Sequence, residues 1–192
     1  YTSTRTLKFT ISARKMKEAN IVMSATQDTY DGPTQYPTIS VSYNGITLRQ
    51  GTDYTISYPK SLKAGKNTIK VKGRVNFTGT VSLKFTVNKA SLENAVVTLP
   101  YAWAYTGKNV KVIPTRVVVE NTVLTNKKDY TIKYIDSNGK RKSSVKNPGE
   151  YQIVLTGKKN YIGTITLKFC ITSDQTLLNN NYNSGAGTVT GG

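Results

Sequence analysis

A cluster of basic side chains is the first feature of this sequence that could perform chemistry. The stretch around residues 137–148, SNGKRKSSVKNP, contains Lys140, Arg141, Lys142 and Lys146. Cations this close together can hold an anionic partner such as teichoic acid, an acidic glycan or a nucleic acid. Nucleic acid is disfavoured because neither a groove-reading helix nor an aromatic-interleaved motif accompanies the cluster. The alternative interpretation is a solvated loop that is merely rich in lysine.

Three aromatic residues form the second candidate site. Tyr101, Trp103 and Tyr105 alternate with alanine, and on a strand this spacing places all three rings on one face. Such a stripe can stack on a sugar or anchor a protein partner. The alternative is packing in the core or against a neighbouring repeat. These three residues and the four basic ones are the candidate polymer-binding residues of the chain.

Acidic residues recur at positions that favour turns over metal binding. Asp53 and Asp129 each precede a tyrosine at matched positions of a repeated motif, which predicts that each carboxylate accepts backbone N–H groups in a turn. Residues 28–32 and 136–139 resemble fragments of calcium loops. Each fragment has fewer oxygen ligands than the six to eight that Ca²⁺ takes. The sequence therefore predicts turns, no metal site and no cofactor.

The reactive side chains argue against catalysis. The chain has no histidine, which is the commonest general base and metal ligand. It has neither paired carboxylates in a motif nor a phosphate-cradling glycine loop. The single cysteine, Cys170, excludes an intramolecular disulfide. Cys170 aligns with Thr86 on the polar face of a predicted strand, so we expect a surface thiol. The sequence predicts a protein that is not an enzyme.

The elements that would position these residues form a repeat, and missing a repeat would misassign the whole fold. Asn76–Val87 (NFTGTVSLKFTV) matches Asn160–Ile171 (NYIGTITLKFCI), and Tyr1–Ser12 (YTSTRTLKFTIS) is a partial third copy. The chain is therefore divided into four parts: the final strand of a preceding repeat at 1–12, repeat one at 13–88, repeat two at 89–172, and a flexible tail or linker at 173–192.

Within each repeat, apolar and polar residues alternate between turn signals, which is the pattern of half-buried strands. In repeat one, Asn44-Gly45 follows such a run and favours a type I′ hairpin, in which both central residues have positive φ. The last strand carries polar Ser82, Lys84 and Thr86 on one face, as is typical of an antiparallel sheet with one solvated side. About six or seven short strands per repeat predict an all-β fold of tandem antiparallel β-sandwiches.

The composition is that of a basic β-protein. Its 192 residues include 27 Lys and Arg against 10 Asp and Glu, a formal net charge of +17. Repeat two carries 14 basic and 5 acidic residues, and repeat one carries 11 and 4, so the excess charge is spread over both. No run of 18 apolar residues occurs, so the sequence predicts no membrane span.

Several motifs together resemble a known family. They are Tyr-Asp/Thr-Gly (30–32 and 105–107), Leu-x-x-Gly-x-Asp-Tyr-Thr-x-x-Tyr (48–58), a spaced Gly/Val/Gly motif (65–73) and Asn-Phe/Tyr-x-Gly-Thr followed by Phe (76–85 and 160–169). Over residues 1–172 this arrangement is similar to the bacterial Ig-like repeats named for their Tyr-Asp-Gly motif. The resemblance implies immunoglobulin-like sandwiches, an extracellular, cell-surface or cell-wall setting, and neighbouring Ig-like repeats as partners. It transfers no catalytic residues.

The expected function is a structural stalk or spacer segment of a cell-surface or secreted multi-repeat protein, with cell adhesion as one such role. The alternative is a module that binds anionic cell-wall polymer or carbohydrate through the basic loop or the aromatic stripe of repeat two. Residues 1–12 present an apolar face of Leu7, Phe9 and Ile11. Because unpaired strands seek partners, we expect this segment to pack on repeat one, to pair with another chain or to be mobile.

Overall fold

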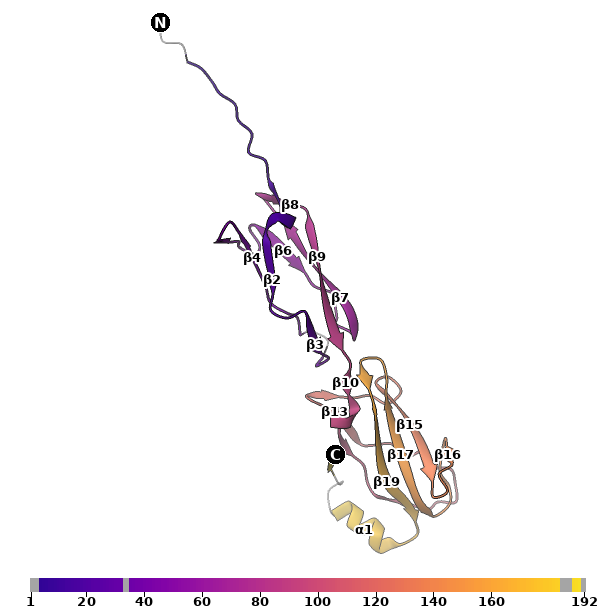
Figure 1. Cartoon of the computed structure of the whole chain (residues 1–192). Helices are drawn as coiled ribbons and strands as arrows, with labels where there is room; N and C mark the ends of the chain where they lie inside the picture. The colour runs from indigo at the N-terminus through magenta and orange to yellow at the C-terminus, as the bar shows by residue number, and fades with distance from the viewer. Residues whose placement is uncertain (1–3, 33–34, 184–187, 191–192) are drawn as a thin grey trace. The chain divides into compact units, whose positions relative to one another are not determined.

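The chain divides into two compact units of mostly β-structure. The computed structural model describes residues 4–32, 35–183 and 188–190, and it is 50% strand with one short helix (Figure 1). Unit 1 comprises Tyr1–Asp28, Thr34–Leu62 and Lys66–Thr86. Unit 2 comprises Thr29–Pro33, Lys63–Gly65 and Val87–Gly192.

Unit 1 contains two sheets and a short parallel pair of strands. The sheets have the strand orders β2-β4-β5 and β3-β9-β7-β6, and β1 pairs in parallel with β8. Buried apolar side chains from both sheets form its core, among them Val41 of β4 and Val71 of β7. The elements are β1 (Arg14–Lys15), the 3₁₀ helix η1 (Met16–Glu18), β2 (Asn20–Met23), β3 (Gln27–Thr29), β4 (Ile39–Tyr43), β5 (Ile46–Thr47), β6 (Tyr54–Ser57), β7 (Gly65–Gly73), β8 (Phe77–Thr78) and β9 (Thr80–Asn88). Of these, β3, β7 and β9 extend a residue or two beyond the unit.

The hairpin between β4 and β5 has the predicted turn. Asn44 has a φ of 49° and Gly45 a φ of 79°, and Tyr43 faces Ile46 across the pair. Positive φ at both central residues defines a type I′ turn, and asparagine and glycine are the residues that adopt it at least cost. The sequence prediction of this hairpin is confirmed.

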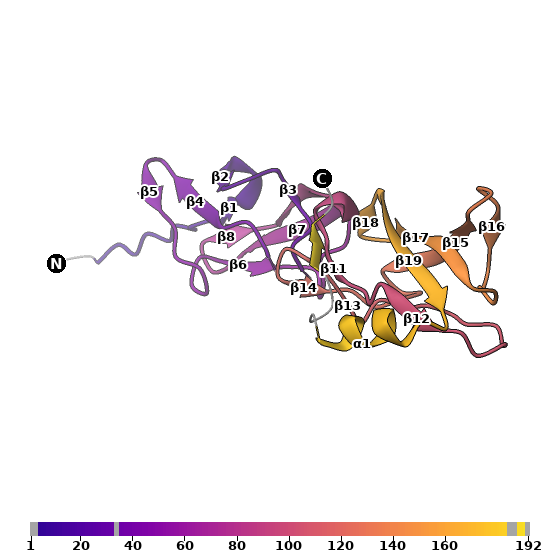
Figure 2. The ribbon, with the colours of Figure 1, turned by 90° about the horizontal axis from the view of Figure 1, so that it is seen from below.

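Unit 2 contains a five-stranded and a four-stranded sheet. Their strand orders are β12-β19-β17-β15-β16 and β14-β13-β11-β20 (Figure 2). Buried residues of both sheets form one core, which includes Val97, Val117, Ile153 and Phe169. The elements are β10 (Ala90–Ser91), the 3₁₀ helix η2 (Leu92–Asn94), β11 (Val96–Thr98), β12 (Ala102–Ala104), β13 (Arg116–Val119), β14 (Thr122–Val123), β15 (Tyr130–Asp136), β16 (Arg141–Lys142), β17 (Gly149–Gly157), β18 (Tyr161–Ile162), β19 (Thr164–Thr172), α1 (Gln175–Asn183) and β20 (Thr188–Thr190).

Parallel strand pairs correct the prediction of purely antiparallel sheets. β12 runs parallel to β19, and β1–β8 and β10–β18 are also parallel pairs. A short turn forces two strands to be antiparallel, whereas a parallel pair needs a long connection. β12 and β19 are separated by most of unit 2, so no turn determines their relative direction. The alternation of apolar residues, which carried the sequence prediction, contains no information on strand direction.

One order of elements occurs in both units. A short strand and a 3₁₀ helix come first. Corresponding strands then follow in the same order: β2 and β11, β3 and β12, β4 and β13, β5 and β14, β6 and β15, β7 and β17, β8 and β18, and β9 and β19. In each unit the first short strand pairs in parallel with the short strand that precedes the last long one. β16, α1 and β20 stand outside this correspondence. Unit 2 therefore carries additions to a shared pattern.

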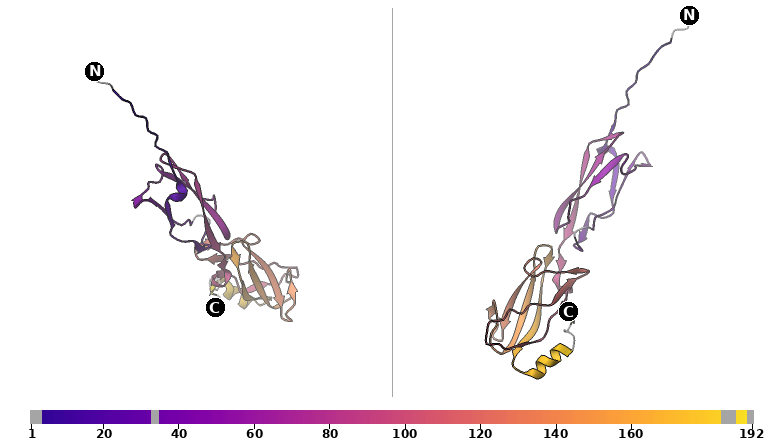
Figure 3. Two further views of the ribbon diagram at one scale, coloured as in Figure 1. Left: turned by 45° about the horizontal axis from the view of Figure 1, so that its top comes forward. Right: turned by 180° about the vertical axis from the view of Figure 1, so that it is seen from behind.

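Two elements lie in the segment 173–192, where the sequence predicts a flexible tail or linker; residues 184–187 and 191–192 lie outside the described residues. α1 follows β19 directly (Figure 3), and β20 pairs antiparallel with β11. Oδ1 of Asp174 accepts a hydrogen bond from the backbone N–H of Thr176 at 2.8 Å, which caps the N-terminus of α1. Asparagine is a poor helix former, so the Asn-rich composition concealed a helix that this cap and half-buried Leu178 stabilise.

The sequence predicts a strand at residues 1–12; residues 1–3 lie outside the described residues, and residues 4–12 do not form it. They have no regular secondary structure, and Leu7, Phe9 and Ile11 are 83%, 83% and 82% exposed. A strand exists only where a neighbour supplies hydrogen bonds, and no described residue forms a strand pair with this segment. The segment therefore does not pack on repeat one, while pairing with another chain and mobility stay predictions.

Candidate functional site

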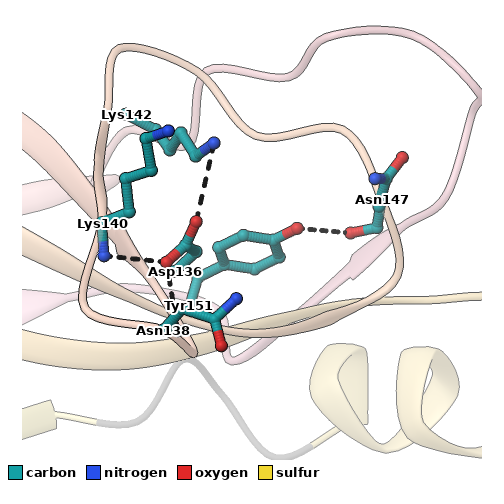
Figure 4. Close-up of polar contacts among 6 residues, drawn as sticks. All are labelled: Asp136, Asn138, Lys140, Lys142, Asn147 and Tyr151. Carbon is teal, nitrogen blue, oxygen red and sulfur yellow. Dashed lines mark hydrogen bonds and ion pairs between the residues drawn. The ribbon is translucent and has the colours of Figure 1, made fainter.

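Lys140, Arg141 and Lys142 of the basic cluster lie on the β15–β16 hairpin, and Lys146 follows it. Asp136 shapes the turn of the hairpin. Oδ1 of Asp136 accepts hydrogen bonds from the backbone N–H groups of Asn138 (3.1 Å) and Lys140 (2.8 Å) (Figure 4). Gly139 has a φ of 75°, a conformation that glycine adopts without steric cost. The prediction of a turn over residues 136–139 is confirmed.

Lys142 and Lys146 line a depression on one side of the hairpin. Nζ of Lys142 lies 3.6 Å from Oδ2 of Asp136 (Figure 4). Both lysines and Asp136 line a volume of about 360 Å³ together with Tyr151, whose hydroxyl donates to the backbone oxygen of Asn147 at 2.8 Å. The Asp136 carboxylate offsets part of the positive charge, so this side of the hairpin is less cationic than its lysine count suggests.

Arg141 lies on the opposite face of the sheet. Strand pairing aligns it with Ile135, Gln152 and Lys168 in one row across β16, β15, β17 and β19. Lys133, two residues before Ile135 on the same strand, shares this face and is exposed. The predicted basic cluster is therefore divided between two faces, and Arg141 joins two lysines that the sequence analysis missed. Only the strand register, which the sequence does not reveal, could have placed Lys133 and Lys168 on the same face as Arg141.

The contacts of the turn hold the pKa of Asp136 below its ordinary value. The largest cause is the hydrogen bond from the backbone N–H of Lys140; desolvation opposes it, and the N–H of Asn138 and the ammonium of Lys142 add to the lowering. All three groups interact more favourably with the charged carboxylate than with the neutral acid. The folded hairpin therefore favours ionised Asp136.

This lowered pKa predicts that the hairpin loosens at low pH. The Asp136 contacts stabilise the fold fully above the ordinary aspartate value of 3.8, and this stabilisation is lost as the pH falls through the lower folded-state pKa. We expect the amide ¹H and ¹⁵N shifts of Asn138 and Lys140 to titrate together with a midpoint below 3.8. An NMR pH titration measures this midpoint. In Asp136→Asn the transition should disappear, and a midpoint at or above the ordinary value would contradict the hydrogen-bonded turn.

The three aromatic residues differ in exposure and in their contacts. Trp103 is half-buried and packs against the core of unit 2, and its Nε1–H donates to the backbone oxygen of Pro100 at 2.9 Å. Tyr101 and Tyr105 are each 42% exposed, and the hydroxyl of Tyr101 donates to Glu150 at 2.8 Å. β12 contains Trp103 but neither tyrosine, so a shared face for the three rings stays a prediction.

Cys170 is buried, which corrects the expectation of a surface thiol. The residue is 7% exposed, and strand pairing places Ala102 on one side of it and Glu150 on the other. Burial, with a smaller contribution from the Glu150 carboxylate, raises the pKa of the thiol. The alignment with Thr86 identified the correct face of the strand. It did not reveal that β12 and the Tyr101–Glu150 hydrogen bond cover this face at Cys170.

The Asp-Tyr motifs have the same structural role in both units. Oδ2 of Asp53 accepts the backbone N–H of Arg49 at 2.8 Å, and Oδ2 of Asp129 accepts that of Thr125 at 2.9 Å. Each carboxylate closes a turn four residues long before a strand begins. The prediction that these aspartates are turn acceptors is confirmed.

A groove beside β12 contains residues that the sequence analysis missed. It has a volume of about 610 Å³, and Trp103 lines it together with Gln175, Leu178 and Asn179 of α1. α1 was not expected, so its residues could not be assigned to any site. Trp103 is thus the one predicted site residue that lies in this groove.

Among the described residues, no group of three or more His, Cys, Asp or Glu side chains could hold a metal ion, and no helix is long and apolar enough to cross a membrane. No protein-family model, no curated protein and no solved structure matches the chain. Function is therefore inferred from the residues and their geometry.

Proposed function

We propose that the chain is a spacer segment of a bacterial cell-surface or secreted protein, built from two immunoglobulin-like β-sandwiches in tandem. The observation that carries the proposal is the recurrence of one element order in both units. Repeated modules that stack along a chain suit the task of holding other parts of a protein at a distance.

The residues shared by the two repeats support this proposal because their contacts maintain the fold. Asp53 and Asp129 close equivalent turns. Phe85 and Phe169, at matched positions of the last strand, are 1% and 0% exposed. A motif kept for a shared chemical task would place reactive side chains at the surface, whereas these shared side chains hold turns and fill cores. Any binding role must come from the residues in which the repeats differ.

Single-molecule force spectroscopy on the full chain tests the spacer. Two mechanically separate modules should unfold in two discrete events under load. At up to about 3.6 Å per extended residue, repeats of 76 and 84 residues release roughly 27 and 30 nm of chain. A single event, or gradual extension with no event, would overturn the proposal.

Antibody labelling of intact cells that produce the protein tests its surface location, and labelling only after permeabilisation would count against it.

A second candidate function is the binding of an anionic cell-wall polymer. The observation that favours it is the row on the outer face of the five-stranded sheet, where Arg141 and Lys168 stand at either end with Ile135 and Gln152 between them. Lys133 lies on the same face of β15. Closely spaced cations raise the local concentration of a polyanion. This surface belongs to unit 2, as the sequence analysis expected for any binding role.

A salt-dependent pull-down on purified teichoic acid distinguishes local from diffuse charge. Retention at low salt should be lost in the Lys133/Arg141/Lys168→Ala variant, which removes three charges from this face. The matched control, Lys66/Lys70/Lys72→Ala, removes the same charge from exposed positions of β7 and should retain binding. Equal losses in the control and test variants, or no retention by the native chain, would overturn this second candidate.

A further inference from the structure

The groove beside β12 combines an aromatic ring with polar side chains. Pro100, Trp103 and Thr106 line it from the β12 side, and Gln175, Leu178 and Asn179 line it from α1. Its volume of about 610 Å³ lies in the range of small-molecule sites, which are mainly apolar with a few polar groups that orient the ligand.

One face of α1 forms the second wall of the groove. Gln175, Leu178 and Asn179 stand at positions i, i+3 and i+4, which share one side of a helix. α1 contacts β12 and is held at its start by Asp174, whose Oδ1 accepts the N–H of Thr176. Leu178 is half-buried, whereas both amide side chains are exposed. The helix therefore presents one apolar contact flanked by two groups that can donate and accept hydrogen bonds.

In Trp103, the face of the indole ring is the part of the side chain that a ligand can contact. Its Nε1–H already donates to Pro100 at 2.9 Å, and the indole is half-buried against the core of unit 2. This hydrogen bond fixes the ring orientation. The part of the ring that lines the groove can then stack on a flat or apolar ligand surface.

The lining is electrically neutral, which separates this site from the basic surfaces of the chain. None of the described residues that line the groove is ionisable, although the chain has 27 Lys and Arg. A polyanion would gain no charge pairing here. An aromatic platform with two primary amides and a threonine hydroxyl instead matches a pyranose, whose C–H face is apolar and whose rim carries hydroxyl donors and acceptors.

We propose that this groove binds a neutral oligosaccharide. Trp103 stacks on one sugar ring, and the side-chain amides of Gln175 and Asn179 hydrogen-bond to its hydroxyls. Leu178 covers the apolar edge. This activity is independent of the spacer role and uses α1, which has no counterpart among the described residues of unit 1.

The test uses the full chain with three neutral probes: chitotriose, cellotriose and maltotriose. Trp103 is the only tryptophan, so its emission reports directly on the groove. We expect at least one probe to give a saturable change in emission, with ¹⁵N–¹H shifts confined to residues 101–106 and 175–179.

Isothermal titration calorimetry then compares the affinities of variants. Gln175→Ala/Asn179→Ala should weaken binding at least fivefold, since each lost hydrogen bond contributes about 0.5–1.5 kcal/mol.

Two further variants complete the experiment. Trp103→Leu keeps an apolar side chain against the core but removes the ring, and it should weaken binding about 30-fold or more, as loss of a central aromatic anchor does. Thr176→Ala is the matched control on α1 outside the groove lining and should bind as the native chain. The proposal is overturned if none of the three probes changes the spectra at millimolar concentration. It is equally overturned if the double amide variant binds like the native chain.

Discussion

Replacing Phe169 with alanine is expected to lower the free energy of unfolding of unit 2 by about 3–5 kcal/mol. Phe169 is 0% exposed. Its ring makes an edge-to-face contact with Tyr134 at a centroid distance of 6.0 Å and stacks on Tyr151 at 5.6 Å. Truncation removes both aromatic contacts and leaves a cavity that strands on either side of β19 cannot close, because their hydrogen bonds fix their spacing.

Urea unfolding followed by tryptophan fluorescence measures this loss. Trp103 is the only tryptophan of the chain and packs against the same core, so its emission reports the unfolding of unit 2. Lys168→Ala is the matched control, because Lys168 precedes Phe169 on β19 and is exposed. It should change the free energy of unfolding by no more than about 0.5 kcal/mol. A loss below about 1 kcal/mol in Phe169→Ala would contradict a fully packed ring.

Local features of the fold could be predicted from the sequence because their causes are local. The Asn44-Gly45 turn depends on two residues that tolerate positive φ, and the turns at Asp53 and Asp129 depend on a carboxylate four residues from its donor. The alternation along the last strands predicts which side chains are buried, as Phe85 and Phe169 show. Each of these effects acts within a few residues, so a pattern in the sequence is enough to reveal it.

Features that depend on pairing between distant segments could not be predicted. The burial of Cys170 requires β12 to lie beside β19, and residues 102 and 170 are far apart in the sequence. The same pairing is parallel, which alternation cannot distinguish from antiparallel. Residues 4–13 show the converse case: their alternation matches that of β9 and β19, yet without a neighbour they form no strand.

The candidate site was predicted in part for the same reason. The types of residue were identified correctly as basic and aromatic, but strand register decides which of them meet. It separates Arg141 from Lys142 and brings Arg141 into a row with Lys168. The groove at Trp103 depends on α1, which is stabilised by the Asp174 cap and by contact with β12. Neither contribution has the regular apolar period by which helices are usually recognised.

Gly157→Ala is expected to destabilise unit 2 by about 1–3 kcal/mol or more, through overpacking of a close backbone contact. A Cβ atom at Gly157 would lie 2.7 Å from the backbone nitrogen of Ile162 and 2.8 Å from the carbonyl carbon of Tyr161. Backbone atoms cannot rotate away as a side chain can. β17 and β18 would have to separate, although the N–H of Gly157 donates to the backbone oxygen of Gly163 at 2.9 Å.

The direction of the stability change in Gly157→Ala distinguishes a close backbone contact from an open strand position. At a strand position without a clash, alanine restricts the unfolded chain and stabilises a protein by about 0.4–1 kcal/mol relative to glycine. A stabilised Gly157→Ala variant would therefore show that β18 does not approach β17 as described. Urea unfolding followed by Trp103 emission gives the sign directly. Thr156→Ala, at the exposed neighbouring position, controls for the general effect of alanine in β17.

Gly73 gives the same test in unit 1, which contains no tryptophan. A Cβ atom at Gly73 would lie 2.7 Å from the carbonyl carbon of Phe77 and 2.8 Å from the carbonyl oxygen of the same residue. The backbone N–H of Gly73 donates to the backbone oxygen of Gly79 at 2.9 Å. Amide hydrogen exchange in β7 should be faster in Gly73→Ala than in the native chain. Because the two glycines occupy matched positions before β8 and β18, destabilisation in both variants would establish this close crossing as the reason the motif keeps glycine in each repeat.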